Sequence, residues 1–517
     1  MKSLYPRLSQ ITLTDWLAYH PYNEESPSDQ FYIGLCNDIQ HEMLLIDVED
    51  QLVGADYKYL ACMLTCFFED MVSQTGIWTS FTNEHYRLYG KYLPFYDMEG
   101  YDHGDINLAD IQFLIWHFFS SLSVHGRFVD PFSIENTEMA RMVYAMMNET
   151  VEQAPANDCL NRSLILPPDA NFAELTKCLD FFFFGCYLNH YYTTTLMQEE
   201  ILHVKNRNGT QEDVNDRRAD LLFNRVSPLL AQRACEISAR WLGDAHPFHQ
   251  NLLSLSERKE GYFLYEGATD THLQMKHIAS GILIDLVRHN CHFPLKEGKT
   301  TVRMGIVQWN GEWYATAPVF PATDQENIKI AESEKYLFAQ NASQLGIVRR
   351  EEECFLEIAH NNRIVFLESK NDAFNFIDNI WEIFHIRYGK DSMDRKMFDV
   401  HEVTFNVYDD LENLVIFFNS RSGMEFYPDI AQSITAWDNP FFDNTAETDI
   451  ENLFLDERIS SDFIVFLINN KMIETESLTG GSGYHYVWAN CDFLLRYRKK
   501  EKYASAAISL QKIQFDL

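Results

Sequence analysis

The stretch from Asn107 to Val124, NLADIQFLIWHFFSSLSV, constrains the fold of this chain more than any other. Asn107 is a residue type that caps helix N-termini, and Asp110 follows three residues later, where a short acid can complete a capping arrangement. Beyond them, apolar residues recur at helical spacing until little polar surface is left. Because a helix that is apolar on nearly all sides must be buried, we expect a central core helix here.

Three polar side chains interrupt this helix along one narrow line, Asp110, His117 and Ser121. They either form a buried, hydrogen-bonded chain or mark the exposed edge of the helix. The exposed edge is the interpretation that we favour. The apolar run is too short to span a bilayer, which takes roughly 20 residues.

The chain has 517 residues and a formal net charge of −34 at pH 7. Because a chain of this length exceeds the size at which a single core keeps growing, we expect two or three domains. The phosphates of nucleic acids and anionic lipids are held mainly by Lys and Arg. The acidic balance therefore argues against nucleic-acid and membrane partners, and it would favour the approach of a cationic protein partner.

The compartment is indicated by the first residues and by the cysteines. The opening MKSLYPRLSQITLTDW turns polar at once, unlike a secretory leader, and no apolar segment is long enough for a membrane anchor. The ten cysteines are scattered and include no CxxC pair. Such cysteines behave as small buried hydrophobes, so we expect reduced thiols and a cytoplasmic location.

The hydrophobic period changes from helical to alternating after Pro294. We therefore expect an α+β protein, with a mainly all-α N-terminal half, residues 1–295, and a smaller α+β C-terminal half, residues 296–517. Its sheet should be mostly antiparallel, because hairpins rather than long crossovers link the expected strands. A final helix over about residues 271–289 would close the N-terminal half.

Local signals place the elements of the C-terminal half. Asn310 and Gly311 both tolerate positive φ, so Trp309-Asn310-Gly311-Glu312 predicts a type I′ hairpin. A helix is expected over 372–388, ending at Gly389. Further strands are expected at 354–359, 363–368, 403–407 and 414–418, and further helices after Pro428, Ser461 and Asn490.

Several phrases of the sequence resemble one family, namely LTDWLAYHPY, KYLACMLTCFFEDMVSQTGIW, LYGKYLPFYD, INLADIQFLIWHFF and CDFLLRYRKKEKY. They look like an uncharacterised bacterial family that is catalogued only as a domain of unknown function. The resemblance is spread over nearly the whole chain. It implies a bacterial cytoplasmic protein, and it implies no activity, cofactor or catalytic residue.

Four histidines could converge on zinc, His246 and His249 in HPFH and His289 and His292 in HNCH. A structural zinc site uses four nitrogen or sulfur ligands in pairs of short spacing, which these pairs supply only loosely. We favour the alternative that they are surface histidines or lie at helix ends. The acids before the central helix do not follow a calcium-loop pattern, and no HExxH occurs. We therefore expect no metal and no other cofactor.

One cluster of cations stands out in this acidic chain, Arg496, Arg498, Lys499, Lys500 and Lys502. It lies at the expected end of the helix after Asn490, where cations complement the negative pole of the helix dipole. We favour this role. The alternative is a docking patch for an acidic surface, such as the chain's own acidic stretch 443–457.

No motif of a known reaction is present. The GGSG at 480–483 lacks the lysine and the following helix of a phosphate loop, and there is no GxSxG elbow. No catalytic or cofactor-binding residue is therefore assigned, and the function is unknown at this stage. The interpretation that we favour is a non-catalytic cytoplasmic interaction or scaffolding protein. The alternative is a hydrolase or metal-dependent enzyme without a recognisable motif.

Overall fold

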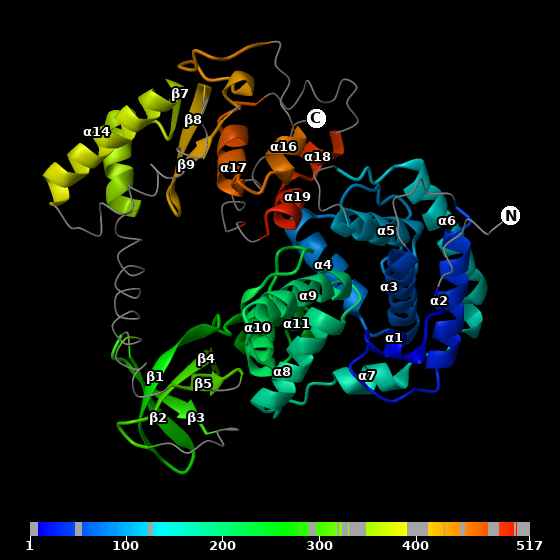
Figure 1. Ribbon diagram of the computed structural model, residues 1–517. Helices are drawn as coiled ribbons and strands as arrows, with labels where there is room; N and C mark the ends of the chain where they lie inside the picture. Colours follow the sequence, from blue (N-terminus) through cyan, green and yellow to red (C-terminus); the bar gives the residue numbers. More distant parts are fainter. Residues whose placement is uncertain are drawn as a thin grey trace.

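A computed structural model gives the fold of the chain (Figure 1). The residues that it describes are 9–46, 54–122, 128–278, 280–288, 296–317, 320–322, 329, 348–389, 412–428, 430–444, 450–473, 485–500 and 503. The fold is α+β, as expected: helices fill the N-terminal half, and two sheets follow.

The first part of the chain is a succession of helices. They are α1 (Leu13–Leu17), α2 (Asp29–Met43), α3 (Gly54–Ser73), α4 (Ile77–Tyr89), α5 (Leu108–Leu122), α6 (Ile134–Thr150), η1 (Val151–Gln153), α7 (Asp158–Leu164), α8 (Phe172–Asp180), η2 (Phe181–Gly185), α9 (His190–Asn206), α10 (Gln211–Asn224), α11 (Ala234–Leu242) and α12 (His249–Leu253). Reciprocal capping boxes start several of them, for example Thr12 with Asp15 at α1 and Asn171 with Glu174 at α8.

The expected helix α5 is confirmed as the centre of the largest core. The side chains from Ile111 to Phe118 are all buried except Gln112. Trp116 is 1% exposed and donates its indole N–H to the carbonyl of Val129 at 2.9 Å. The side-chain oxygen of Asn107 accepts from the backbone N–H of Asp102 at 3.1 Å instead of capping the helix, while Asp110 accepts from the backbone N–H of Asn107 at 3.0 Å.

The exposed edge expected on α5 is wrong, because Asp110 and His117 are buried, Ser121 is half-buried, and all three are hydrogen-bonded. Nδ1 of His117 lies 2.8 Å from the hydroxyl of Tyr497, and Nε2 donates to the carbonyl of Leu188 at 2.9 Å. Ser121 lies 3.1 Å from the same hydroxyl, and Asp110 is 0% exposed and accepts from Tyr101 at 2.8 Å. Partners far away in the sequence satisfy these groups, so they can be buried without leaving an unpaired donor or acceptor.

A sheet of six strands follows the helices. It contains β1 (Lys259–Ala268), β2 (His272–His277), β3 (Leu283–Val287), β4 (Thr301–Trp309), β5 (Glu312–Ala315) and β6 (Phe320–Ala322). All pairs are antiparallel except the parallel contact of β3 with β5. Because β1 pairs with both β2 and β4, the first five strands close on themselves as a small barrel. Phe263, Leu273, Met275 and Leu286 are among the residues that fill it.

The hairpin between β4 and β5 is confirmed, with positive φ at Asn310 and Gly311. The helix expected over 271–289 is wrong, because β2 and β3 occupy this region. Leu273 and Met275 are buried, whereas Gln274 between them and Lys276 after them are exposed. This alternation is a strand pattern with a period of two residues.

A second, antiparallel sheet contains β7 (Ile364–Ser369), β8 (Glu412–Asn419) and β9 (Gly423–Tyr427). The helix α14 (Lys370–Tyr388) ends before Gly389, as expected. The strand expected at 354–359 is wrong, because residues 348–358 are helical and Cys354 and Phe355 pack on α14 and β8 as its apolar side. The expected strand at 403–407 lies outside the described residues.

The last described elements are helical. They are η3 (Ala431–Ser433), α16 (Ile450–Leu455), α17 (Ser461–Asn469), α18 (His485–Ala489) and α19 (Cys491–Arg498). Helices therefore follow Pro428, Ser461 and Asn490, as expected. Figure 1 places α19 beside α4 and α5, far from it in the sequence. Among the described residues, no helix combines the length and the apolar character needed to cross a bilayer.

The division into residues 1–295 and 296–517 stays a prediction. Two features of the structure cross this boundary. Lys259 to Leu264 of β1 pair with Thr301 to Ile306 of β4. The largest core joins α5 to α17, α18 and α19. Contacts across a boundary work against independent folding of the two parts.

Limited proteolysis tests this division. We expect cleavage within 294–300, PLKEGKT, because exposed turns with Gly and Lys are cut first. Because β1 pairs with β4 and α19 packs on α5, the two fragments should elute together in native size-exclusion chromatography. Two separate folded peaks would instead show independent domains, and an uncut 294–300 with cleavage within 320–350 would move the boundary.

His117 gives a second prediction. Replacing His117 by Gln should lower the free energy of unfolding at pH 7 by about 1–3 kcal/mol, because Tyr497 and Leu188 lose a well-placed partner. Denaturant unfolding followed by tryptophan fluorescence measures the loss. The control is His203→Gln, an exposed histidine of α9, which should change stability by less than about 0.5 kcal/mol.

The stability of wild type and that of His117→Gln should also depend differently on pH. Burial, together with the nearby Lys500 and Arg498, lowers the pKa of His117 from 6.5 to about 4. The unfolded chain therefore binds a proton between these pH values while the folded chain does not, so stability falls as pH drops through this window. Between pH 7 and pH 4.5, wild type should lose roughly 2 kcal/mol more than His117→Gln. Parallel pH profiles would show that His117 is not buried as a neutral imidazole.

Candidate functional site

A chain of buried polar side chains joins the loop after α1 to helices α2, α3 and α7. Nε2 of His20 lies 2.7 Å from Oε2 of Glu69 on α3, and Nδ1 lies 2.9 Å from the carbonyl of Trp16. The other oxygen of Glu69 accepts from the amide of Asn157 at 2.8 Å. Asn157 also donates to the hydroxyl of Tyr22 at 2.7 Å, and that hydroxyl donates to Asp29 at 2.8 Å.

This network is almost completely removed from solvent. Asp29, Glu69 and Asn157 are each at most 1% exposed, and His20 is 8% exposed. Asp29 also accepts from the indole of Trp16 at 3.1 Å and from the backbone N–H of Ser26 at 2.6 Å. Because each of these carboxylates has donors on both oxygens, the charges are compensated inside the protein.

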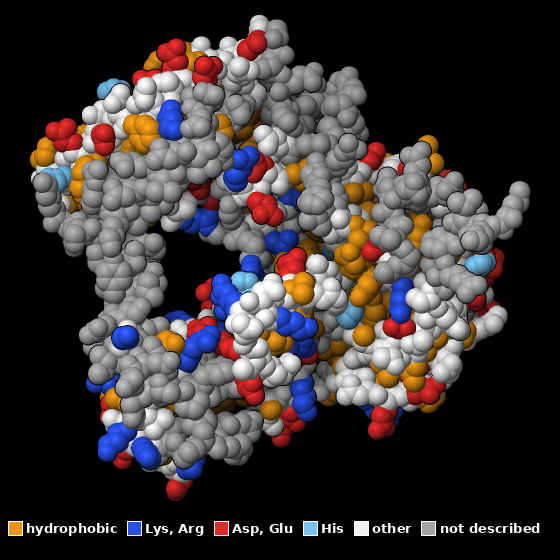
Figure 2. Space-filling view, viewed as in Figure 1, with side chains coloured by type: hydrophobic (Ala, Val, Ile, Leu, Met, Phe, Trp, Pro, Cys, Tyr) orange, Lys and Arg blue, Asp and Glu red, His pale blue; other side chains and the backbone are white. Residues whose placement is uncertain are grey.

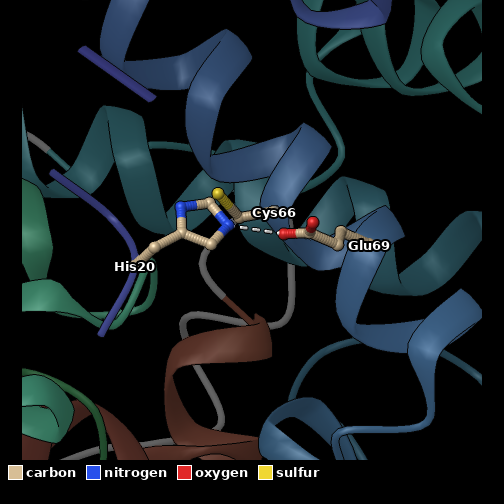
Figure 3. Close-up of side chains that lie close together, drawn as sticks. All are labelled: His20, Cys66 and Glu69. Carbon is tan, nitrogen blue, oxygen red and sulfur yellow. Dashed lines mark hydrogen bonds and ion pairs between the residues drawn. The ribbon is translucent and has the colours of Figure 1, made fainter. Parts of the chain in front are cut away.

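Cys66 brings a third kind of donor atom to the same place. Cys66 and Glu69 are three residues apart on α3, so they project to the same side of the helix. Sγ of Cys66, a ring nitrogen of His20 and a carboxylate oxygen of Glu69 all lie within 4.8 Å of one another. Figure 3 shows the imidazole of His20 directed at Glu69, with the sulfur of Cys66 beside the ring. Imidazole, thiolate and carboxylate are all ligands of zinc in proteins.

The charge states at this cluster follow from burial and from Glu69. Burial raises the pKa of the Cys66 thiol well above its ordinary value, and the Glu69 carboxylate adds to the effect. Burial acts to lower the pKa of His20, but the attraction of Glu69 outweighs it, so the pKa is raised. Without a bound cation, the cluster therefore contains a thiol and an imidazolium paired with a carboxylate.

A groove of about 890 Å³ lies beside this cluster. Residues 18–23 and 163–167 form part of its walls, and α8, η2, α9 and Arg218 of α10 form the rest. His20 belongs to both the groove wall and the buried network. The volume is within the range of ligand-binding pockets, about 300–1,000 Å³.

The segment η2, FFFFG, is a π-helix at the edge of the groove. The backbone N–H of Cys186 donates to the carbonyl of Phe181 at 2.7 Å, five residues earlier. A Cβ atom at Gly185 would approach the ring of Phe181 to 3.0 Å, so a glycine is needed for this close approach. Single π turns in helices are frequent at functional sites.

The polar side chains of the groove are held by specific contacts. His190 donates from Nδ1 to the carbonyl of Phe184 at 2.7 Å, and its ring lies tilted against that of Tyr19, with the ring centroids 4.1 Å apart. Arg218 holds both oxygens of Asp180 at 2.6 and 2.8 Å and lies over the ring of Phe184. These contacts fix the shape of the groove before any ligand enters.

The described histidines of the zinc alternative, His246 and His249, each contact a different backbone carbonyl. Nε2 of His246 donates to the carbonyl of Leu166 at 3.1 Å. His249 contacts the carbonyl of Ala239 at 2.9 Å and Asp244 at 3.2 Å. These are contacts of neighbouring loops and helices. His289 and His292 lie outside the described residues.

The cationic cluster lies at the C-terminal end of α19, as the dipole interpretation expects. Its side chains contact the rest of the chain. Arg496 pairs with Asp492 at 3.1 Å, Arg498 donates to the carbonyl of Ser120 at 3.2 Å, and Lys499, which is 4% exposed, donates to the carbonyl of Asp456. Lys500 lies 4.7 Å from the ring of Tyr192, and Lys502 is outside the described residues.

The contact of Lys499 with Asp456 lies within the acidic stretch 443–457. The bond is to the backbone carbonyl of Asp456, whose carboxylate pairs with Arg458, so docking of these cations on the chain's own acids stays a prediction. The described members of the cluster do not form a free docking surface. Lys499 is buried, and Arg498 is buried deeply enough that its pKa is lowered.

Fold and site together define an α+β protein with a helical N-terminal part that contains both the buried network and the groove. Residues 10–237 match the model of a family described as "Protein of unknown function (DUF3843)". The expected resemblance to a domain of unknown function is thus confirmed over this part of the chain, which includes His20, Cys66, Glu69 and Asn157. No curated protein and no solved structure matches the chain.

The sequence analysis did not find His20, Cys66 or Glu69. One signal was available in KYLACMLTCFFEDM, where Glu69 and Asp70 interrupt an otherwise apolar helical run. Acids on a buried helix face require partners, and this requirement points to a functional or structural cluster. Their partner His20 is 49 residues away, which no local pattern reveals.

Asn157 allows a test of the network with a matched control. Asp caps helices as well as Asn does, so Asn157→Asp keeps the cap of α7 but places a second carboxylate against Glu69. We expect a loss of about 2–4 kcal/mol in the free energy of unfolding at pH 7, because two donated hydrogen bonds disappear and like charges meet in a buried site.

The control is Asn171→Asp. Asn171 caps α8 through the same two kinds of contact, but it is exposed and faces no buried acid. Its replacement should change stability by less than about 0.5 kcal/mol in the same denaturant titration. Equal effects of the two variants would contradict a buried, ionised Glu69.

Proposed function

We propose that this chain is a non-catalytic interaction protein, and that the groove beside His20 binds a segment of a protein partner. The single observation that carries this proposal is the composition of the groove. Apolar walls such as Ile165, Phe181 and Phe184 alternate with polar groups that are already held in place. A rigid groove with apolar pockets and fixed polar groups suits recognition of an extended segment.

The chemistry of the groove supports binding over catalysis. Burial raises the pKa of the groove thiol Cys178 to about 12, so it is protonated at neutral pH and is a poor nucleophile. Both carboxylate oxygens of Asp180 accept hydrogen bonds from Arg218. Among the described residues of the groove, Oγ1 of Thr194 lies 3.5 Å from Nε2 of His190, which is long for the hydrogen bond that would activate a hydroxyl nucleophile. The hydrolase alternative has less support for this reason.

The exposed side chain of Ile165, at the rim of the groove, also supports the proposal. Ile165 is 67% exposed, and it lines the groove beside Leu164 and Leu166. A large apolar side chain at a rim is a favourable anchor for a partner, because contact removes it from water.

The charge of the chain supports a protein partner rather than a nucleic acid. A net charge of −34 repels phosphate backbones and favours a partner with basic surface. Figure 2 shows acidic and basic side chains interspersed among the described residues of the face in view. We propose a cytoplasmic location in a bacterial cell, which the nine free cysteines among the described residues support.

Photocrosslinking identifies the partner. A photoreactive amino acid at Ile165 should form one discrete adduct in the source cells, and mass spectrometry of the adduct gives the bound segment. The same amino acid at Ile386, which is 77% exposed on α14 and lies outside the groove, is the control and should not form this adduct.

Groove-filling variants then test the site with the purified partner. Gln198 lines the groove, and its neighbour Glu199 on the same helix is exposed outside it. Gln198→Trp should weaken binding at least tenfold, about 1.4 kcal/mol, because the indole fills the groove, whereas Glu199→Trp should stay within about twofold of wild type. Equal losses would place the binding surface elsewhere.

A further inference from the structure

We infer that His20, Cys66 and Glu69 form a binding site for one divalent transition-metal ion, for which zinc is the best match. The site goes beyond the proposed interaction function, since its ligands belong to the buried network and two of them lie outside the groove lining. The inference rests on donor identity, spacing, charge and the contacts behind the ligands.

The donor set indicates a borderline metal ion. One imidazole nitrogen, one sulfur and one carboxylate oxygen converge here. Magnesium and calcium prefer oxygen ligands alone, whereas zinc takes nitrogen, sulfur and oxygen together. Three protein ligands fill all but one position of a tetrahedral ion, and a water or another small ligand can take the last.

The spacing of the donor atoms requires little movement. With zinc–ligand bonds of about 2.0–2.3 Å, ligand atoms of a tetrahedral site lie roughly 3.3–3.8 Å apart. The three atoms lie within 4.8 Å of one another, and the closest pair, Nε2 of His20 and Oε2 of Glu69, is 2.7 Å apart. Shifts of about 1 Å or less, which side-chain rotation supplies, bring them to these separations.

The contacts behind the ligands are those of a metal-binding histidine. The carbonyl of Trp16 can only accept, so Nδ1 of His20 carries a proton and Nε2 is directed at the cluster. Asn157 holds the outer oxygen of Glu69 at 2.8 Å. Metal-ligating histidines usually donate their other ring N–H to a carbonyl or carboxylate, which fixes the ring and its tautomer.

Charge balance favours a divalent ion at this depth. A thiolate and a carboxylate carry two negative charges, and a neutral imidazole adds none, so one divalent cation makes the buried site neutral. The ion takes the place of two protons, one on Nε2 of His20 and one on Sγ of Cys66, and both leave to solvent. Among the described residues, no other role is assigned to the thiol of Cys66.

The test uses the untagged full-length chain. After purification without chelators, elemental analysis should find about one zinc per chain. X-ray absorption at the zinc edge should count one sulfur in a shell of nitrogen and oxygen. A folded chain without metal that also takes up no added Zn²⁺ or Co²⁺ would overturn the inference, and so would a zinc shell with no sulfur or with several.

Cobalt replacement assigns the ligands. Co²⁺ added to the metal-free chain should give the visible bands of a tetrahedral ion and a near-ultraviolet thiolate band. Cys66→Ser should lose the thiolate band, whereas Cys62→Ser, at an equally buried cysteine one turn earlier on α3, should keep it. His20→Gln and Glu69→Gln should weaken Co²⁺ binding at least about tenfold. A thiolate band that survives Cys66→Ser, or disappears in Cys62→Ser, overturns the assignment; if Cys66→Ser does not fold, the sulfur count of wild type decides.

Discussion

The packing of α19 against α5 holds the last described helix in the same core as the N-terminal helices. Tyr497 inserts its hydroxyl between His117 and Ser121, which are 380 and 376 residues away in the sequence. Arg498 and Lys499 follow with bonds to the carbonyls of Ser120 and Asp456. Because these polar groups are buried, each needs its particular partner, and the contact therefore fixes both the position and the register of the last helix.

Features set by neighbouring residues could be predicted from the sequence. The hairpin at Asn310-Gly311, the helix before Gly389 and the apolar character of α5 depend on turn chemistry, capping and periodicity, which act over a few residues. The strands β2 and β3 were missed although Leu273 and Met275 alternate with polar residues, because the neighbouring apolar residues also fit a helical period. Short apolar segments of this kind are decided by their tertiary partners.

The candidate site could not be predicted, because its contacts are long-range. His20 meets Glu69 over 49 residues, and Asn157 meets Glu69 over 88. The histidines that stand close together in the sequence, His246 and His249, satisfy separate backbone carbonyls instead. The burial of Glu69 is the property that points most directly to the site, and the sequence does not show it. A buried acid must recruit donors from elsewhere in the fold, and the sequence alone names none of them.

The network and the groove share one loop, so the two proposals are physically linked. His20 and Tyr22 point into the network, while Ala18, Pro21 and Asn23 line the groove. The ring of Tyr19 contacts that of His190, which also lines the groove. An ion held by His20 would restrict this loop and so preform one wall of the groove. By linkage, a partner that binds the preformed groove more tightly must then raise the affinity for the ion by the same factor. The ion and the partner would both act on residues 19–23, which lie between Ala18 and Glu24.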